Sequence, residues 1–139
     1  MPLIDCSKVY VDTSQFSTPD NVFMGAFANI DILKGDLIEK GLMRRLDYSF
    51  DGMNNPYVFT WSDEIPNHTW AFASGCATFY NSSLEKYANT KMVRHFSENR
   101  FEIVATQDIQ KGDELTHQYK SLEWRTAFQP LNELLHESN

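Results

Sequence analysis

A nine-residue pattern, A-x-x-D-I-x-K-G-D, occurs twice in the chain and limits its fold more than any other sequence feature. The two copies span residues 28–36 and 105–113, and each places Asp and Gly, which favour chain reversal, between apolar segments. Two copies of one strand–turn–strand unit predict a pseudo-symmetric core of small sheets. The alternative is that one favourable turn sequence was used twice. Asp113 and the following Glu114 are interpreted as turn chemistry and a solvated edge.

The segments on either side of the second copy show the alternation that is typical of strands. Apolar side chains recur at every second position from Phe101 to Ala105, which predicts a half-buried strand. After the turn, Leu115, His117 and Tyr119 fall on one face of a second strand, and the residues between them fall on the other. A phenol and an imidazole are therefore expected to face the same space.

Length and composition favour a single domain with a mostly-β fold. The chain has 139 residues, of which 42% are hydrophobic, so it can bury a core of its own. Aromatic residues are frequent, and helical periodicity is confined to the C-terminal end, where a short helix is expected. Further strands are predicted at Lys8–Val11, Val22–Ala28, Leu37–Leu42, Tyr57–Trp61 and Lys91–Phe96.

The formal net charge of −7 bears on the partners of the chain. An acidic surface disfavours direct binding to nucleic acid and favours basic partners, such as peptides rich in Lys or Arg. No apolar run reaches the length of a membrane span, and the N-terminus lacks a signal pattern. We therefore expect a soluble, intracellular protein that binds neither a membrane nor, directly, nucleic acid.

Residues with metal-binding side chains are few and scattered along the chain. Cys6 and Cys76 lie far apart in sequence without a C-x-x-C motif. We interpret them as reduced thiols and expect no metal site. His68, His95 and His136 are interpreted as surface or packing residues.

Four separated segments resemble motifs of the SET domain, the catalytic domain of protein-lysine methyltransferases, and they occur in the order found in that family. They are Gly25-Ala26-Phe27-Ala28 with Lys34-Gly35-Asp36-Leu37-Ile38, Tyr57-Val58-Phe59, Tyr80-Asn81-Ser82-Ser83 with Ala88-Asn89, and Gly112–Tyr119. The resemblance covers about Val22–Trp124 within one domain of residues 1–139. It implies a SET-domain, β-clip-like fold with a pseudoknot-like C-terminal crossing. Because no flanking cysteine cluster is present, the chain resembles the minimal stand-alone domains of viruses and bacteria.

The resemblance also implies a reaction, a cofactor and a set of site residues. The reaction is transfer of a methyl group from S-adenosylmethionine to the ε-amine of a lysine in a histone or another basic protein. Tyr57 and Tyr119 are the expected catalytic residues, because they would line the channel in which the lysine is positioned and its ammonium form is disfavoured. The residues expected to bind the cofactor are Phe23, Met24, Gly25, Tyr80, Asn81, Ser82 and Trp124. For Trp124 a core position under the C-terminal helix is the alternative.

His117 stands two residues before the final tyrosine of the family motif, where the resemblance places a residue of the substrate channel. An imidazole ordinarily titrates near neutral pH. The hypothesis is that His117 makes activity or product distribution depend on pH between about six and seven. The alternative is a histidine that is merely packed or faces outward.

Three features depart from the family pattern. Phe23 replaces a glycine, Ser82 replaces a histidine, and Asn81 and Asn89 are two residues further apart than is usual. These departures support an alternative function, a SET-like module that binds a lysine-rich peptide without turnover. The resemblance also implies a homodimer as one way to complete the peptide groove.

Overall fold

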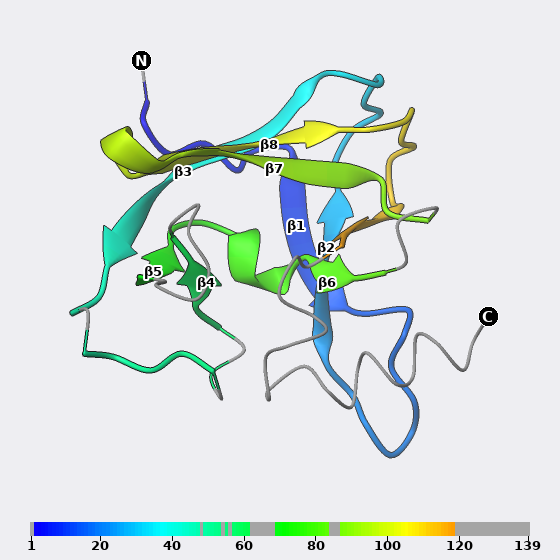
Figure 1. Cartoon of the computed structure of the whole chain (residues 1–139). Helices are drawn as coiled ribbons and strands as arrows, with labels where there is room; N and C mark the ends of the chain where they lie inside the picture. The colour runs from blue at the N-terminus through cyan, green and yellow to red at the C-terminus, as the bar shows by residue number, and fades with distance from the viewer. Residues whose placement is uncertain are drawn as a thin grey trace.

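A computed structural model describes residues 2–47, 49–53, 55, 57–61, 69–83 and 87–118. These residues form short strands and two single-turn 3-10 helices, so the mostly-β prediction is confirmed (Figure 1). The elements are β1 (Val9–Thr13), β2 (Met24–Ala28), β3 (Leu37–Arg45), β4 (Phe59–Thr60), β5 (Trp70–Ala73), η1 (Ala77–Phe79), β6 (Asn81–Ser82), β7 (Thr90–His95), η2 (Phe96–Glu98), β8 (Arg100–Ala105) and β9 (Glu114–His117). The expected C-terminal helix lies outside the described residues.

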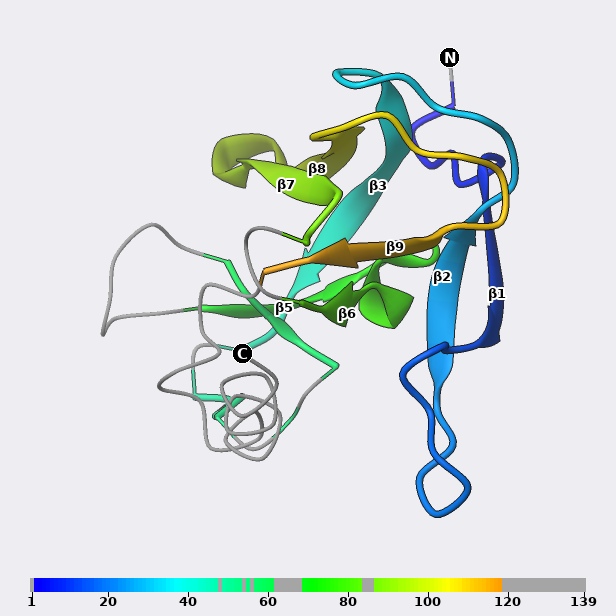
Figure 2. The same cartoon turned by 90° about the vertical axis from the view of Figure 1, so that its right-hand side faces the viewer.

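The strands form two sheets, and both sheets contribute residues to the hydrophobic core. One sheet has the order β1-β2-β9-β6, and the other has the order β4-β5-β3-β8-β7. Most neighbouring strands are antiparallel, but β6 and β9 run parallel and are far apart in sequence. Figure 2 shows β9 beside β2, with β1 on the outer side of β2. Within the ranges that the structure describes, no helix is long and apolar enough to cross a membrane.

The two copies of the sequence repeat pair with each other through matching hydrogen bonds. The backbone N–H of Lys34 donates to Oδ1 of Asp108, and that of Lys111 donates to Oδ1 of Asp31, both at 2.8 Å. An isolated bridge joins the two isoleucines that follow these aspartates. Each turn also contains a glycine with positive φ, 91° in the first copy and 93° in the second. The predicted pseudo-symmetry is therefore confirmed at the turns.

The strands attached to these turns continue the pairing. β2 of the first unit pairs with β9 of the second, and β3 of the first pairs with β8 of the second. Phe27 lies opposite Glu114 in one pair, and Val104 lies opposite Leu37 in the other, which are equivalent positions of the repeat. The symmetry then ends, because the register of β3 shifts between Leu37 and Glu39. This bulge sends β3 on a path that β9 does not follow.

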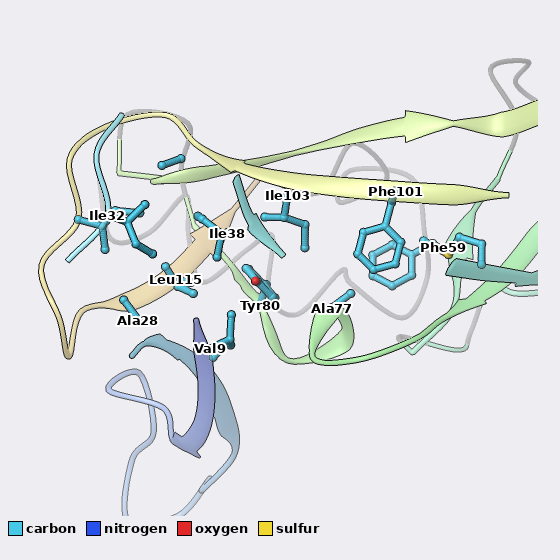
Figure 3. Packing of buried hydrophobic residues seen from close by; sticks show 14 of the residues in the cluster. Val9, Ala28, Ile32, Ile38, Phe59, Ala77, Tyr80, Phe101, Ile103 and Leu115 are labelled. Atoms are coloured by element: carbon cyan, nitrogen blue, oxygen red, sulfur yellow. The ribbon is translucent and has the colours of Figure 1, made fainter. Parts of the chain in front are cut away.

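A hydrophobic core fills the space between the two sheets. Figure 3 shows Ile103 of β8 pointing towards Tyr80, whereas Phe101 of the same strand lies beside Phe59. Buried and half-buried residues alternate along β8, which confirms the half-buried strand predicted there. All four residues of β9 are buried, including Thr116 at 3% exposure. Both faces of β9 are therefore covered, since this strand lies between β2 and β6 in its sheet and also contacts β7.

Candidate functional site

The side chain of Asn81 joins β2, β6 and β9 at one end of the four-stranded sheet. Asn81 begins β6 and lies opposite Thr116 in the parallel pairing with β9. Its Nδ2 donates to the carbonyl oxygen of Met24 at 3.0 Å and to Oε2 of Glu114 at 2.9 Å. Because both amide hydrogens are used, these bonds fix Asn81 relative to β2 and β9.

The carboxylate of Glu114 holds the opposite side of this junction. It is 5% exposed, and it accepts hydrogen bonds from the Ser14 hydroxyl at 2.9 Å and from the Gln15 N–H at 2.9 Å. A Cβ at Gly25 would collide with Oε2 of Glu114, so glycine is required for this close approach. Interpreting Glu114 as a solvated edge residue is therefore wrong. The interpretation holds for Asp113, which is exposed in the turn, but the next side chain points inward.

His117, at the other end of β9, lies in the interior beside Tyr80. Its side chain is 5% exposed, and its ring centroid is 6.1 Å from that of Tyr80. Burial, followed by the positive charge of Arg94, lowers the pKa of His117 to about 3. The imidazole is therefore neutral at pH 6 to 7. This low pKa favours the alternative of a packed histidine over a pH response between six and seven.

The phenol of Tyr80 faces the core (Figure 3). It is fully buried, and its hydroxyl donates to Oε1 of Glu39 at 2.9 Å. Burial, followed by the charge of Glu39, raises the pKa of Tyr80 above its ordinary value. These contacts leave the backbone of Tyr80, rather than its hydroxyl, as the part that adjoins Asn81.

Asn89 holds β9 through hydrogen bonds that imitate a neighbouring strand. Its Nδ2 donates to the carbonyl oxygen of Glu114 at 2.9 Å, and its Oδ1 accepts from the N–H of Thr116 at 2.8 Å. Further along, the N–H of Ser83 donates to the carbonyl oxygen of His117 at 2.9 Å. Hydrogen bonds therefore hold β9 from two segments, the one that contains β6 and the one that precedes β7.

Comparison with protein-family models assigns residues 24–120 to the SET domain. The chain belongs to the SET domain family. This stretch includes the two repeat turns and also β2, β6 and β9, which meet at Asn81. A comparison with curated protein sequences gives no match.

Solved structures of SET proteins share the fold at low sequence identity. A putative histone methyltransferase from Plasmodium falciparum is 20% identical with a TM-score of 0.57, and the match covers 81% of this chain and 92% of that one. ATXR5 in complex with mono-methylated histone H3.1 is 21% identical with a TM-score of 0.63, over 90% of this chain and 63% of that one.

A third similar structure is the polycomb repressive complex 2 of Chaetomium thermophilum, bound to S-adenosylmethionine in an autoinhibited conformation. It is 21% identical with a TM-score of 0.63, and the match covers 97% of this chain. The chain spans only 17% of the length of that polycomb protein. At these identities the likenesses establish the SET fold.

The SET motif residues predicted from the sequence lie in different surroundings. Met24, Gly25, Tyr80, Asn81 and Ser82 come together because β2, β9 and β6 are neighbours in one sheet. Ser82 is 4% exposed, whereas Met24 is 40% exposed.

The remaining predicted residues lie outside this group or outside the described part of the chain. The half-buried Phe23 precedes β2, and its backbone is bonded to the Ser17 hydroxyl in both directions. Tyr57 is 65% exposed, so its phenol lies at the surface. Tyr119 and Trp124 lie outside the described residues. Glu114 and Asn89 were not among the predicted site residues, although both stand in the motifs that resemble the family.

Proposed function

We propose that this chain is a protein-lysine methyltransferase that transfers a methyl group from S-adenosylmethionine to a lysine ε-amine. The observation that carries the proposal is the SET domain match over residues 24–120, together with the convergence of the matched strands on Asn81. The polycomb structure with bound S-adenosylmethionine supports the choice of donor.

The groups around Asn81 are suited to S-adenosylmethionine. Both hydrogens of the Asn81 amide are used within the chain, but no described residue donates to its Oδ1. This oxygen can therefore accept a hydrogen bond from an amino group of the cofactor. The neighbouring Met24 is partly exposed and offers an apolar surface beside it. When bound, the cofactor supplies an activated methyl group on a sulfonium centre.

We assign the lysine channel to Tyr57 and Tyr119. Transfer to an amine requires a neutral nucleophile that is aligned with the methyl group, so positioning supplies much of the rate. A narrow aromatic channel excludes water and lowers the pKa of the lysine ammonium, which favours the neutral amine. The exposed Tyr57 is available to a peptide that arrives from solvent. His117, neutral and buried, adds no competing charge.

The proposed substrate is a basic protein, of which a histone is the example. The chain has a net charge of −7, which attracts Lys-rich and Arg-rich peptides over long distances. The ATXR5 structure contains histone H3.1, which supports a histone-like substrate. We also keep the proposal that a second copy of the chain completes the peptide groove.

A binding module without turnover is the second candidate. Its support comes from Ser82, which stands where the family has histidine and whose side chain is 4% exposed and turned inward. Such a module would hold a lysine-rich peptide without transferring a methyl group. The two candidates differ in methyl transfer, which only the enzyme performs.

The test is a thermal-shift titration with S-adenosylmethionine. A ligand that binds only the folded state at 100 times its Kd stabilises the protein by about 2.7 kcal/mol, so Tm rises clearly. We expect this rise in the wild type and in the control variant Asn29→Ala, whose side chain lies in the exposed first turn. Asn81→Ala is expected to lose it. An unchanged Tm in the wild type would contradict the proposal, and a Tm rise without methyl transfer would favour the binding module.

A further inference from the structure

Two cysteines and a glutamate from separate segments converge on one side of the molecule. Cys6 precedes β1, Glu39 lies in β3, and Cys76 immediately precedes η1. The two sulfur atoms and a carboxylate oxygen all lie within 4.8 Å of one another. We propose that these three residues form a binding site for a thiophilic divalent cation, with zinc as the ion that fits best.

The carboxylate of Glu39 is held in one orientation by neighbouring donors. It is 1% exposed, its Oε2 accepts the N–H of Cys76 at 2.8 Å, and its Oε1 accepts the hydroxyl of Tyr80 at 2.9 Å. An ionised carboxylate has about four acceptor positions, so lone pairs remain for a cation after these two bonds. Donors of this kind orient the ligands of known metal sites.

The backbone at Gly75 leaves room for the carboxylate between the thiols. A Cβ at this position would collide with Oε2 of Glu39 and would lie 3.6 Å from the sulfur of Cys6. Gly75 also has a φ of 64°, a conformation that glycine adopts at little cost. The chain therefore passes close to Oε2 of Glu39 and to the sulfur of Cys6. Cys6 and Cys76 are half-buried, so an ion can reach the sulfurs from solvent.

The cluster contains no positive charge that would repel a cation. Each of the three groups is neutral or negative, and among the described residues Glu39 takes part in no salt bridge. Buried charge is costly unless it is paired or bound to a metal. A dication would pair with the carboxylate and with two thiolates, while the two thiol protons pass to solvent.

The donor set selects among cations. Two thiolates and one carboxylate, with water as a fourth ligand, match the four-coordinate preference of zinc. Magnesium and calcium prefer oxygen ligands throughout, so they fit less well. The wide separation of the two cysteines along the chain had predicted that they form no zinc site. The fold removes that separation and adds Glu39, which sequence spacing does not associate with either cysteine.

A bound ion would tie the N-terminal segment to the approach to β6. Cys76 leads through η1 to Tyr80 and Asn81, and the hydroxyl of Tyr80 is already bonded to Glu39. The site would therefore act as a clamp between residues 5–7 and the strand that carries Asn81. This role does not depend on the proposed methyl transfer.

The test is titration of the fully reduced chain with Zn²⁺ and, separately, with Co²⁺ as a spectroscopic probe. We expect one ion per chain, a thiolate-to-cobalt absorption band, and protection of both cysteines from alkylation by Zn²⁺. Cys6→Ser and Glu39→Gln are expected to weaken Zn²⁺ binding at least about tenfold, as loss of a supporting group does in known sites. The control His95→Ala removes another potential ligand that lies elsewhere, bonded to Glu102, and should bind normally.

Circular dichroism of each variant shows whether it is folded, and the alkylation assay on the wild type requires no substitution at all. Equal alkylation rates with and without Zn²⁺ would overturn the proposal. So would ready formation of a Cys6–Cys76 disulfide in the presence of Zn²⁺ and air, since bound thiolates resist oxidation.

Discussion

The two repeat units of this chain share one turn but carry different strands after it. In the first unit, β2 leads through the turn to β3, which is nine residues long and leaves the shared register at a bulge. In the second unit, β8 leads through the same turn to β9, which is four residues long, entirely buried and bordered by β2 and β6. The same turn therefore precedes two different strands: β3, which lies outside the candidate site, and β9, which contributes Glu114 to it.

The first difference between the units appears directly after the turns. Leu37 and Glu114 occupy equivalent positions, opposite Val104 and Phe27 respectively. Leu37 is half-buried and apolar, whereas the carboxylate of Glu114 is buried among donors, including Asn81. At this position a buried carboxylate therefore distinguishes β9 from β3.

The largest expected effect tests this difference at the equivalent pair. Glu114→Ala leaves the donors of Ser14, Gln15 and Asn81 without their acceptor, so we expect the free energy of unfolding to fall by about 3 kcal/mol. Leu37→Ala removes only half-buried apolar area and should cost about 1 kcal/mol. Urea unfolding of both variants gives the two values. Equal losses would remove the distinction between the strands.

The pH dependence of the free energy of unfolding tests the burial of His117 in β9. Burial and the charge of Arg94 lower the pKa of His117 to about 3, below the ordinary value of 6.5. As pH falls below 6.5, the unfolded chain takes up a proton that the folded imidazole does not. The stability present above this pH is therefore lost on acidification, by about 1.4 kcal/mol per pH unit for one proton.

Urea unfolding between pH 7 and pH 4.5 measures this slope. Comparison with His117→Phe separates His117 from the carboxylates and from the other histidines, because the variant lacks only the one group. We expect the variant to show a slope smaller by about one proton. Identical slopes would mean that His117 titrates normally and is not buried as described.

The smallest expected effect tests the symmetry itself. Gly35 and Gly112 have nearly the same positive φ, and nothing lies within 4 Å of a Cβ at either position. Alanine should therefore strain the backbone equally in both turns, by about 1 to 2 kcal/mol each. The free energies of unfolding of Gly35→Ala and Gly112→Ala decide this. A clear inequality would show that the turns differ in more than sequence position.

Local sequence patterns predicted the local part of the fold. The repeated A-x-x-D-I-x-K-G-D pattern predicted two like turns, and the spacing of Phe101, Ile103 and Ala105 predicted the buried face of β8. These features depend on neighbours in the chain. The family resemblance then brought Gly25 and Asn81 together, because it supplied contacts that no local pattern contains.

The rest depends on partners that are distant in sequence. Both faces of β9 are buried, and its contact with β7 joins segments that are distant in sequence, so the alternation of its side chains did not predict how deeply Thr116 is buried. The low pKa of His117 follows from that burial, which a sequence does not show. The convergence of Cys6, Glu39 and Cys76 is likewise a product of the tertiary fold.

Methyl transfer to a lysine is the reaction that the proposed function requires. We would incubate the chain with S-adenosylmethionine carrying a labelled methyl group and a lysine-containing histone H3 peptide, and locate the label by mass spectrometry. We expect label on a lysine ε-amine and a fall in kcat of about a hundredfold in Tyr119→Phe, because this variant loses a positioning group. The control Tyr10→Phe, in the exposed strand β1, should keep wild-type activity. Bound cofactor without any labelled lysine, or an equal loss of activity in both variants, would contradict the proposed lysine methyltransferase function.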